Sequence, residues 1–154
     1  MHRRTTVSNE ESSNQSAVNA ANAWNASIID EFRSHDGKVG GPFEGSPVLL
    51  LHTTGARTRA ERTNPMMYLN EDDRIFVFAS KAGADTNPDW FHNLVAEPLV
   101  TVEMGKEKFS ATARPVVGDE HDRIYAVQAE RYPGFAEYQA KTTRVIPVVE
   151  LVRA

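Results

Sequence analysis

Apolar and polar residues alternate in a way that divides the chain into an N-terminal helix and a series of short strands. The helix is predicted over residues 17–34 by apolar side chains that recur at spacings of three and four and so share one face. These side chains are Ala21, Trp24, Ile28 and Phe32. Residues 1–16 are rich in Ser, Thr, Asn, Glu and Gln, which predicts a disordered tail. The remainder, residues 17–154, is expected to form one domain.

After the Gly40–Pro42 turn, the pattern becomes that of strands joined by tight turns. Residues 74–79 are apolar on both faces, which is typical of a central strand, whereas Pro65 indicates an edge or a bulge. Asn87 is expected to cap a helix that starts at Pro88. The predicted strands are residues 48–53, 63–69, 74–79, 99–104, 108–115 and 145–152, and the further predicted helices are residues 88–96, 119–132 and 134–142.

This order of elements predicts a mainly β fold with flanking helices. Six strands in mostly hairpin connections favour an antiparallel sheet that closes into a small barrel. The sequence contains neither a G-x-G-x-x-G motif nor a P-loop, so it offers no support for a common dinucleotide or triphosphate site.

Composition narrows the classes of function. The 154 residues are 40% hydrophobic and 25% charged with a net charge of −4, which argues against a partner that is nucleic acid or an anionic membrane. The longest apolar run, residues 48–51, is too short to span a bilayer, and no apolar stretch follows the basic N-terminus. We therefore expect a cytoplasmic protein with no integral membrane segment. The chain has no cysteine, and its five histidines lack metal-ligand spacing, so no metal is expected.

A basic cluster is the first candidate for chemistry. Arg57, Arg59 and Arg62 follow a Thr-Thr-Gly turn, and guanidinium groups in a tight connection can bind phosphate or carboxylate in a bidentate manner. Lys81, which follows the central strand, could bind the same anion. A solvated hairpin tip with no ligand is the alternative explanation.

Aromatic residues are the second candidate. Trp90 and Phe91 lie at the start of a predicted helix and suit either the wall of an aromatic ligand site or packing of that helix on the barrel. Tyr132, Phe135 and Tyr138 recur at intervals of three, which suits a lid over a flat substrate or a stripe that faces the core. Together, the arginines and aromatics favour an aromatic cofactor with a polyanionic tail.

The chain contains a series of short motifs between residues 45 and 147: GSPVLLLHTTG (45–55), RTNP (62–65), ASKAGAD (79–85), NPDWFHNL (87–94), AEP (96–98), YQ (138–139) and RVIP (144–147). Together these motifs resemble the deazaflavin-dependent nitroreductase family, which includes F420H2-dependent quinone reductases. The resemblance extends over about residues 20–152.

The resemblance implies a split β-barrel like that of flavin-mononucleotide oxidases. It also implies an enzyme that binds coenzyme F420, an 8-hydroxy-5-deazaflavin with an oligoglutamate tail, and transfers a hydride to a quinone, a nitroaromatic compound or an activated double bond. Ser80 and Tyr138 would polarise or protonate the substrate. The cofactor-binding positions would be Ala56, Arg57, Thr58, Arg62, Asn64, Pro65, Phe78, Ala79, Ser80, Lys81, Asp89, Trp90, Phe91, His92 and Asn93. The substrate side would be formed by Tyr132, Phe135 and Tyr138.

Three positions depart from some members of the family. Ala56 replaces a basic residue and Arg59 replaces a glycine, so one positive charge lies at position 59 instead of position 56. Phe135 replaces a tyrosine, and the missing hydroxyl argues against reduction of nitroimidazole-type substrates. The alternatives are an enzyme that uses flavin mononucleotide or haem, a non-catalytic carrier of the deazaflavin, and another ligand-binding split barrel. The expected partners are a small-molecule electron acceptor and, as an alternative to a monomer, a second copy of the chain.

Overall fold

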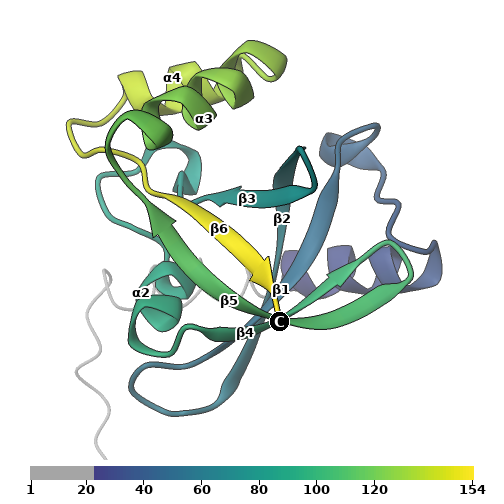
Figure 1. The fold of residues 1–154 in the computed structure, drawn as a ribbon. Coiled ribbons are helices and arrows are strands. Elements are labelled where there is room, and N and C mark those ends of the chain that lie inside the picture. Colours follow the sequence, from purple (N-terminus) through teal and green to yellow (C-terminus); the bar gives the residue numbers. More distant parts are fainter. Residues whose placement is uncertain (1–22) are drawn as a thin grey trace, which may run out of the picture.

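A computed structural model describes residues 23–154 of the protein (Figure 1). The predicted tail over residues 1–16 and the start of the predicted N-terminal helix lie outside the described residues. The strands are β1 (Val48–Thr54), β2 (Glu61–Glu71), β3 (Arg74–Phe78), β4 (Leu99–Met104), β5 (Glu107–Val116) and β6 (Val148–Arg153). The helices are residues 23–34, α2 (Asp89–Ala96), α3 (Gly118–Arg131) and α4 (Gly134–Ala140), with 3-10 turns η1 (Gly41–Phe43) and η2 (Lys81–Gly83).

The six strands form a closed barrel in the order β1-β2-β3-β6-β5-β4, and every neighbouring pair is antiparallel. The predicted fold class is therefore confirmed. Tight turns join β1 to β2, β2 to β3 and β4 to β5, whereas α2 connects β3 to β4, and α3 and α4 connect β5 to β6. No helix within residues 23–154 is long and apolar enough to cross a membrane.

The central strand β3 is apolar on both faces because both faces are covered. Ile75 and Val77 point into the barrel, where they pack with apolar residues of the other strands. Phe76 and Phe78 alternate with them and belong to a second cluster on the outside of the barrel. The prediction that residues 74–79 form a central strand is confirmed, since β3 lies between β2 and β6.

Three helical layers cover the barrel. Trp90 and Leu94 of α2 join the interior cluster. Ile124 and Tyr125 of α3 and Phe135 of α4 pack on the outer face of β3 and β6, and Figure 1 shows α3 and α4 together on that side. The outer face of β1 is covered on the opposite side by the helix at residues 23–34, whose Ile28 and Phe32 contact Val48 and Leu50.

Two boundaries differ from the prediction for a physical reason. β6 begins at Val148 rather than at residue 145, because Arg144 and Ile146 bond to loop and helix groups instead of a neighbouring strand. β2 is longer than predicted and includes Pro65. It pairs with β3 only from Tyr68 onward, so Pro65 has a strand on one side only, as a residue without an amide proton requires.

A partly buried network of an arginine, a glutamate and a histidine ties the N-terminal helix to the barrel. Arg33 donates from Nε and Nη2 to the two carboxylate oxygens of Glu103 in β4, at 3.2 and 2.7 Å. His52 Nε2 lies 2.5 Å from Glu103 Oε2, and its Nδ1 lies 3.0 Å from the Thr63 hydroxyl. The hydrogen bonds from Arg33 and then from His52 lower the pKa of Glu103 to about 2, against the opposing effect of burial.

Acid should therefore weaken the attachment of this helix. The lowered pKa of Glu103 stabilises the folded state fully above its ordinary pKa of about 4.5, and this stabilisation is lost as the pH falls toward about 2. Glu103→Gln should reduce the melting temperature at pH 7. Between pH 5 and pH 2.5, the melting temperature of this variant should fall less than that of the wild type. Glu107→Gln is the control, because Glu107 forms only a surface ion pair with Arg153. Equal pH profiles for the wild type and Glu103→Gln would contradict the assignment.

Candidate functional site

The basic turn between β1 and β2 is held against α2 by one buried side chain. Asn93, in the middle of α2, accepts the backbone amide of Ala56 at 3.0 Å and donates to the Thr53 hydroxyl at 3.2 Å. The turn is closed by the Gly55 amide, which donates to the Ala60 carbonyl at 2.7 Å. Asn93 is thus a positioning group for the turn, and its buried amide is satisfied by these bonds.

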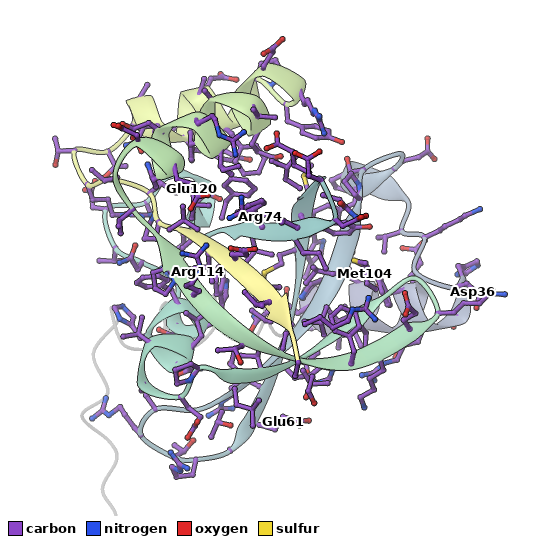
Figure 2. All side chains as sticks on the ribbon, viewed as in Figure 1. Asp36, Glu61, Arg74, Met104, Arg114 and Glu120 are labelled. Carbon is purple, nitrogen blue, oxygen red and sulfur yellow. The ribbon has the colours of Figure 1, made fainter. Side chains whose placement is uncertain are left out.

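Two of the three arginines of this turn differ from most arginines within residues 23–154. Six arginines in this part of the chain, including Arg59 of the turn, form ion pairs with carboxylates: Arg33, Arg59, Arg74, Arg114, Arg123 and Arg153. Figure 2 shows one such group, in which Arg74 and Arg114 lie beside Glu120 on the outer face of the barrel. Arg57 and Arg62 are exposed and have no carboxylate partner within residues 23–154. Their charges are available to an external anion.

The loop that follows β3 adopts an unusual backbone conformation. Lys81, Ala82 and Gly83 all have positive φ, at 47°, 53° and 84°. A residue with a side chain loses roughly 1–2 kcal/mol in this left-handed region, so the surrounding structure must hold the loop in place. Lys81 Nζ donates to the Thr86 hydroxyl at 3.0 Å and is otherwise exposed to solvent.

Arg144, which lies about 60 residues later in the chain, holds this loop through hydrogen bonds. Its Nε donates to the Ala84 carbonyl at 2.8 Å, and its Nη2 donates to the Ser80 carbonyl at 2.9 Å. Its Nη1 donates to the Ala79 carbonyl at 3.2 Å and to Asn87 Oδ1 at 2.7 Å. The prediction that Asn87 caps α2 is wrong, because its side-chain oxygen is used by Arg144 and Pro88 occupies the N-cap position.

The aromatic residues proposed for the substrate side do not form one helical stripe. Tyr132 ends α3, whereas Phe135 and Tyr138 belong to α4. Phe135 is buried in the outer cluster and packs edge-on against Phe78 at 5.6 Å between ring centroids, so the interpretation as a core residue holds for it. Tyr138 is half-buried, and its hydroxyl has no hydrogen-bond partner in the described part of the chain.

A neighbouring tyrosine has a structural role that the sequence did not reveal. The Tyr125 hydroxyl donates to the Phe135 carbonyl at 2.6 Å, which joins α3 to α4. Burial raises the pKa of Tyr125 to about 12, with smaller effects from Arg144 and Tyr138. The hydroxyl is therefore neutral at pH 7 and serves as a fixed hydrogen-bond donor.

The other predicted cofactor positions lie around α2 and the barrel wall. Trp90 is 9% exposed and packs inside the barrel, whereas Phe91 is half-buried and Asp89 and His92 are exposed. Asn64 pairs with Leu51 and Pro65 pairs with Leu50 across β1 and β2. Adjacent strand residues point to opposite faces, so the side chains of Asn64 and Pro65 cannot both face one ligand.

The predicted residues therefore converge on α2 and its two neighbours. The basic turn is bonded to the middle of α2 through Asn93, and the left-handed loop runs directly into the N-terminus of α2 and also contacts α4. Phe91 of α2 is half-buried against the interior cluster, and Tyr138 of α4 is half-buried against the outer cluster. Unpaired cations on the turn and partly exposed aromatic side chains on the two helices are the groups that a planar aromatic ligand with an anionic tail would need.

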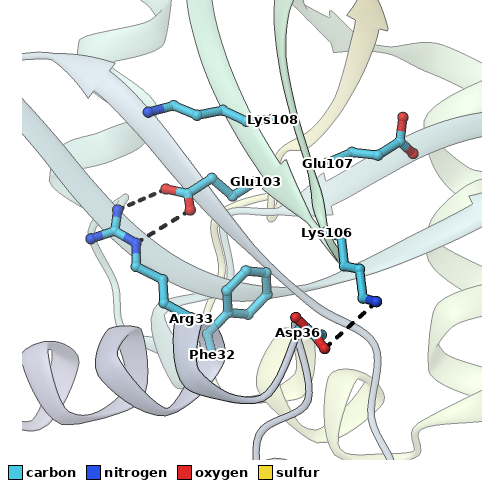
Figure 3. A pocket seen from close by; sticks show the side chains of 8 residues that line it. Phe32, Arg33, Asp36, Glu103, Lys106, Glu107 and Lys108 are labelled. Atoms are coloured by element: carbon cyan, nitrogen blue, oxygen red, sulfur yellow. Dashed lines mark hydrogen bonds and ion pairs between the residues drawn. The ribbon is translucent and has the colours of Figure 1, made fainter.

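Two cavities lie elsewhere, beside the N-terminal helix, and none of the predicted site residues lines either of them. One, of about 290 Å³, is shown in Figure 3 and is lined by Phe32, Arg33, Glu103 and the tip of the β4–β5 hairpin. The other, of about 950 Å³, runs along residues 31–48 and reaches Tyr68. Its lining combines polar and charged residues with glycines and with apolar residues such as Val39 and Val48, and it includes no residue of the basic turn. Residues 23–154 contain no group of His, Asp or Glu side chains placed to hold a metal ion.

Sequence analysis missed Arg144 and Gln139 as organisers of the site. Gln139 Nε2 donates to the Arg144 carbonyl at 2.7 Å, and Gln139 Oε1 accepts the Ile146 amide at 3.0 Å. Both residues lie in motifs that carried the family resemblance, but a contact between Arg144 and carbonyls about 60 residues earlier leaves no local pattern.

Comparisons with known proteins agree on one family. The family model described as F420H(2)-dependent quinone reductase matches residues 24–152. An F420H(2)-dependent quinone reductase of Mycobacterium tuberculosis is 40% identical over 128 residues, which cover 79% of this chain and 85% of that protein. A solved F420-H2 dependent reductase, FDR-A, is 38% identical with a TM-score of 0.63 and covers 68% of this chain and 93% of its own. A solved domain-swapped dimer is 31% identical with a TM-score of 0.65 and covers 85% of this chain and 98% of its own.

Proposed function

The chain belongs to the F420H(2)-dependent quinone reductase family, and on this premise we propose that it reduces a quinone with a hydride from reduced coenzyme F420 bound between the basic turn, α2 and the loop after β3. The protein is an oxidoreductase whose cofactor is F420. The quinone, the binding position and the roles of individual residues are the proposal. Nitroaromatic compounds and activated double bonds are further acceptors to be compared with the quinone.

The observation that carries the proposal is the pair of unpaired guanidinium groups on a rigid turn. Arg57 and Arg62 are exposed, and Asn93 fixes the turn against α2. A phosphate and a chain of glutamates present the anionic groups that such guanidinium groups bind best. Flavin mononucleotide has a phosphate but no oligoglutamate tail, so it would use fewer of these cations.

Bound F420 supplies the hydride, while the protein supplies position and electrostatics. Arg57, Arg62 and Lys81 bind the tail and phosphate, with contributions from Ala56 and Thr58 in the turn. Tyr138 is the proposed donor of a hydrogen bond or proton to the quinone oxygen, and Ser80 is the second candidate.

The remaining predicted positions complete the proposed site. The end of β3 and the segment after it would border the ring, together with one face of β2 and the first turns of α2. Tyr132 and Phe135 would support the substrate side, Phe135 through packing alone because it is buried. The bordering residues are Asn64 or Pro65, whose side chains lie on opposite faces of β2, and Phe78, Ala79, Asp89, Trp90, Phe91, His92 and Asn93.

Cofactor choice and turnover test the function directly. Titration calorimetry should show tighter binding of F420 than of flavin mononucleotide or haem. Reduced F420 should then be oxidised in the presence of a soluble quinone, and the change in the absorbance of the cofactor measures this oxidation. Equal or reversed affinities would contradict the cofactor assignment for this chain. Tight F420 binding without turnover on quinone, nitroaromatic or activated-alkene substrates would indicate a carrier.

Removal of the unpaired cations should weaken cofactor binding. Arg57→Ala or Arg62→Ala should raise the F420 dissociation constant by about tenfold, since a charged hydrogen bond contributes roughly 1.5–3 kcal/mol. The melting temperature should stay unchanged because neither side chain has a carboxylate partner within residues 23–154. Arg131→Ala is the matched control, since Arg131 is also exposed and unpaired there but lies at the end of α3. An unchanged titration of the Arg57/Arg62 double variant would show that the turn is only solvated.

Removal of the Tyr138 hydroxyl and removal of the Tyr125 hydroxyl should have opposite effects on the hydride-transfer rate and on stability. Tyr138→Phe should lower the hydride-transfer rate by about tenfold or more while stability stays near wild type, because the lost hydroxyl has no partner within residues 23–154. Tyr125→Phe should destabilise the fold by about 0.5–1.5 kcal/mol, because its buried hydroxyl bonds to the Phe135 carbonyl. Its hydride-transfer rate should be unchanged. Stopped-flow oxidation of reduced F420 and urea unfolding measure the two effects. A stability loss with normal turnover in Tyr138→Phe would reject its substrate role.

A further inference from the structure

The loop between β3 and α2 holds a conformation that its own residues disfavour. Lys81 and Ala82 both have side chains and both have φ near 50°, in the left-handed region that favours glycine. Within the loop, the Gly83 amide donates to the Ser80 carbonyl at 2.9 Å and the Ala84 amide donates to the Lys81 carbonyl at 3.1 Å. Two such short-range bonds alone are a weak restraint on an exposed loop, so the conformation depends on contacts from outside it.

Arg144 supplies the strongest of these contacts. Its guanidinium donates four hydrogen bonds across the loop, to the carbonyls of Ala79, Ser80 and Ala84 and to the side chain of Asn87. These acceptors lie before, at the start of, and after the left-handed residues. One rigid planar group therefore fixes both ends of the loop relative to each other.

The position of Arg144 is itself determined by α4. Gln139 bonds to the Arg144 carbonyl and to the Ile146 amide, which fixes the segment that carries the guanidinium. α4 also contacts the loop directly at Gly83, where a Cβ atom would lie 2.8 Å from the Tyr138 carbonyl oxygen. The loop, Arg144 and the helix that carries Tyr138 thus form one connected unit.

We propose that Arg144 is a positioning residue that acts through this loop. Its guanidinium holds the left-handed conformation in which the loop presents Ser80 and Lys81 to F420, and it places them at a fixed distance from Tyr138. Four of the five N–H groups of the Arg144 guanidinium donate to the loop and to Asn87, so its role is to orient other groups rather than to bind the anion. The identity of the ligand in this inference rests on the proposed function, whereas the claim that Arg144 holds the loop does not.

The chemistry of the clamp requires arginine. A guanidinium presents donors in a fixed planar fork and can bond to several carbonyls at once, whereas a lysine ammonium is a point charge on a flexible stem. Arg144→Lys keeps the positive charge and removes the fork. It therefore separates the geometric role of Arg144 from a purely electrostatic one.

Hydrogen exchange on the protein without ligand tests the structural part. In Arg144→Lys, the amides of Gly83 and Ala84 should exchange at least about tenfold faster than in the wild type, because the loop opens more often. The amide of Arg59, which donates to the Gly55 carbonyl in the basic turn, is the internal reference and should be unchanged. Arg123→Lys is the control variant, since Arg123 forms only a surface ion pair with Glu71.

Cofactor titration tests the positioning role. Arg144→Lys should raise the F420 dissociation constant about tenfold, with a melting temperature close to wild type, and Arg123→Lys should change neither. Asn87→Ala removes only one of the four bonds and should show smaller changes in the same direction. It provides the measurement if Arg144→Lys does not fold.

The outcomes are distinct. Faster exchange together with weaker binding supports the proposal. Unchanged exchange at Gly83 and Ala84 overturns it, as does faster exchange with unchanged F420 affinity, because the loop then does not serve the ligand. If the wild type itself fails to bind F420, the proposed function fails, and faster exchange in Arg144→Lys would still support the clamp.

Discussion

The structure depends on one constraint, which is that β3 is apolar on both faces and must be covered on both. Its inner face packs against Trp90 and Leu94 of α2, and its outer face packs against Tyr125 and Phe135 of α3 and α4. The chain leaves β3 between these two layers, so the loop that follows has α2 on one side and α4 on the other. The candidate site lies where it does because burial of a single strand requires both helical layers at its end.

Short-range patterns predicted the parts of this arrangement that depend on periodicity. The alternation in residues 74–79 predicted a central strand, and Pro65 predicted the unpaired side of β2, because both signals act within a few residues. The Asn87 cap was wrong because a side chain far along the chain, Arg144, competes for the same oxygen. The three aromatic residues do not share one helix, because the break at Pro133 separates Tyr132 from α4, but all three pack on the outer cluster, as the alternative of a stripe that faces the core predicted.

The charge network around Glu103 is a second contact between distant segments that short-range sequence patterns do not predict. His52 and Glu103 lie on β1 and β4, and Arg33 lies on the N-terminal helix, so only the closed barrel brings the three together. In the sequence, His52 follows a run of leucines and offers no sign of its partners. A carboxylate that bonds to an arginine and a histidine of two other elements cannot be predicted without knowledge of register, and register is a property of the sheet rather than of any one strand.

Electrostatic pairing also distinguishes the arginines that stabilise the fold from Arg57 and Arg62 more sharply than net charge does. The chain carries a net charge of −4, yet its carboxylates neutralise the arginines that stabilise the fold and leave Arg57 and Arg62 without a partner among the described residues. Arg144 is a third case, since it uses its donors on backbone carbonyls. A protein that must hold a flexible anionic tail and a rigid ring needs both kinds of group. Exposed cations follow a mobile tail at little cost, whereas the ring requires a loop whose conformation is fixed before the ligand arrives. In the proposed binding mode, Arg57 and Arg62 would hold the tail, and Arg144, which donates four hydrogen bonds around the loop, would fix the loop before the ring arrives.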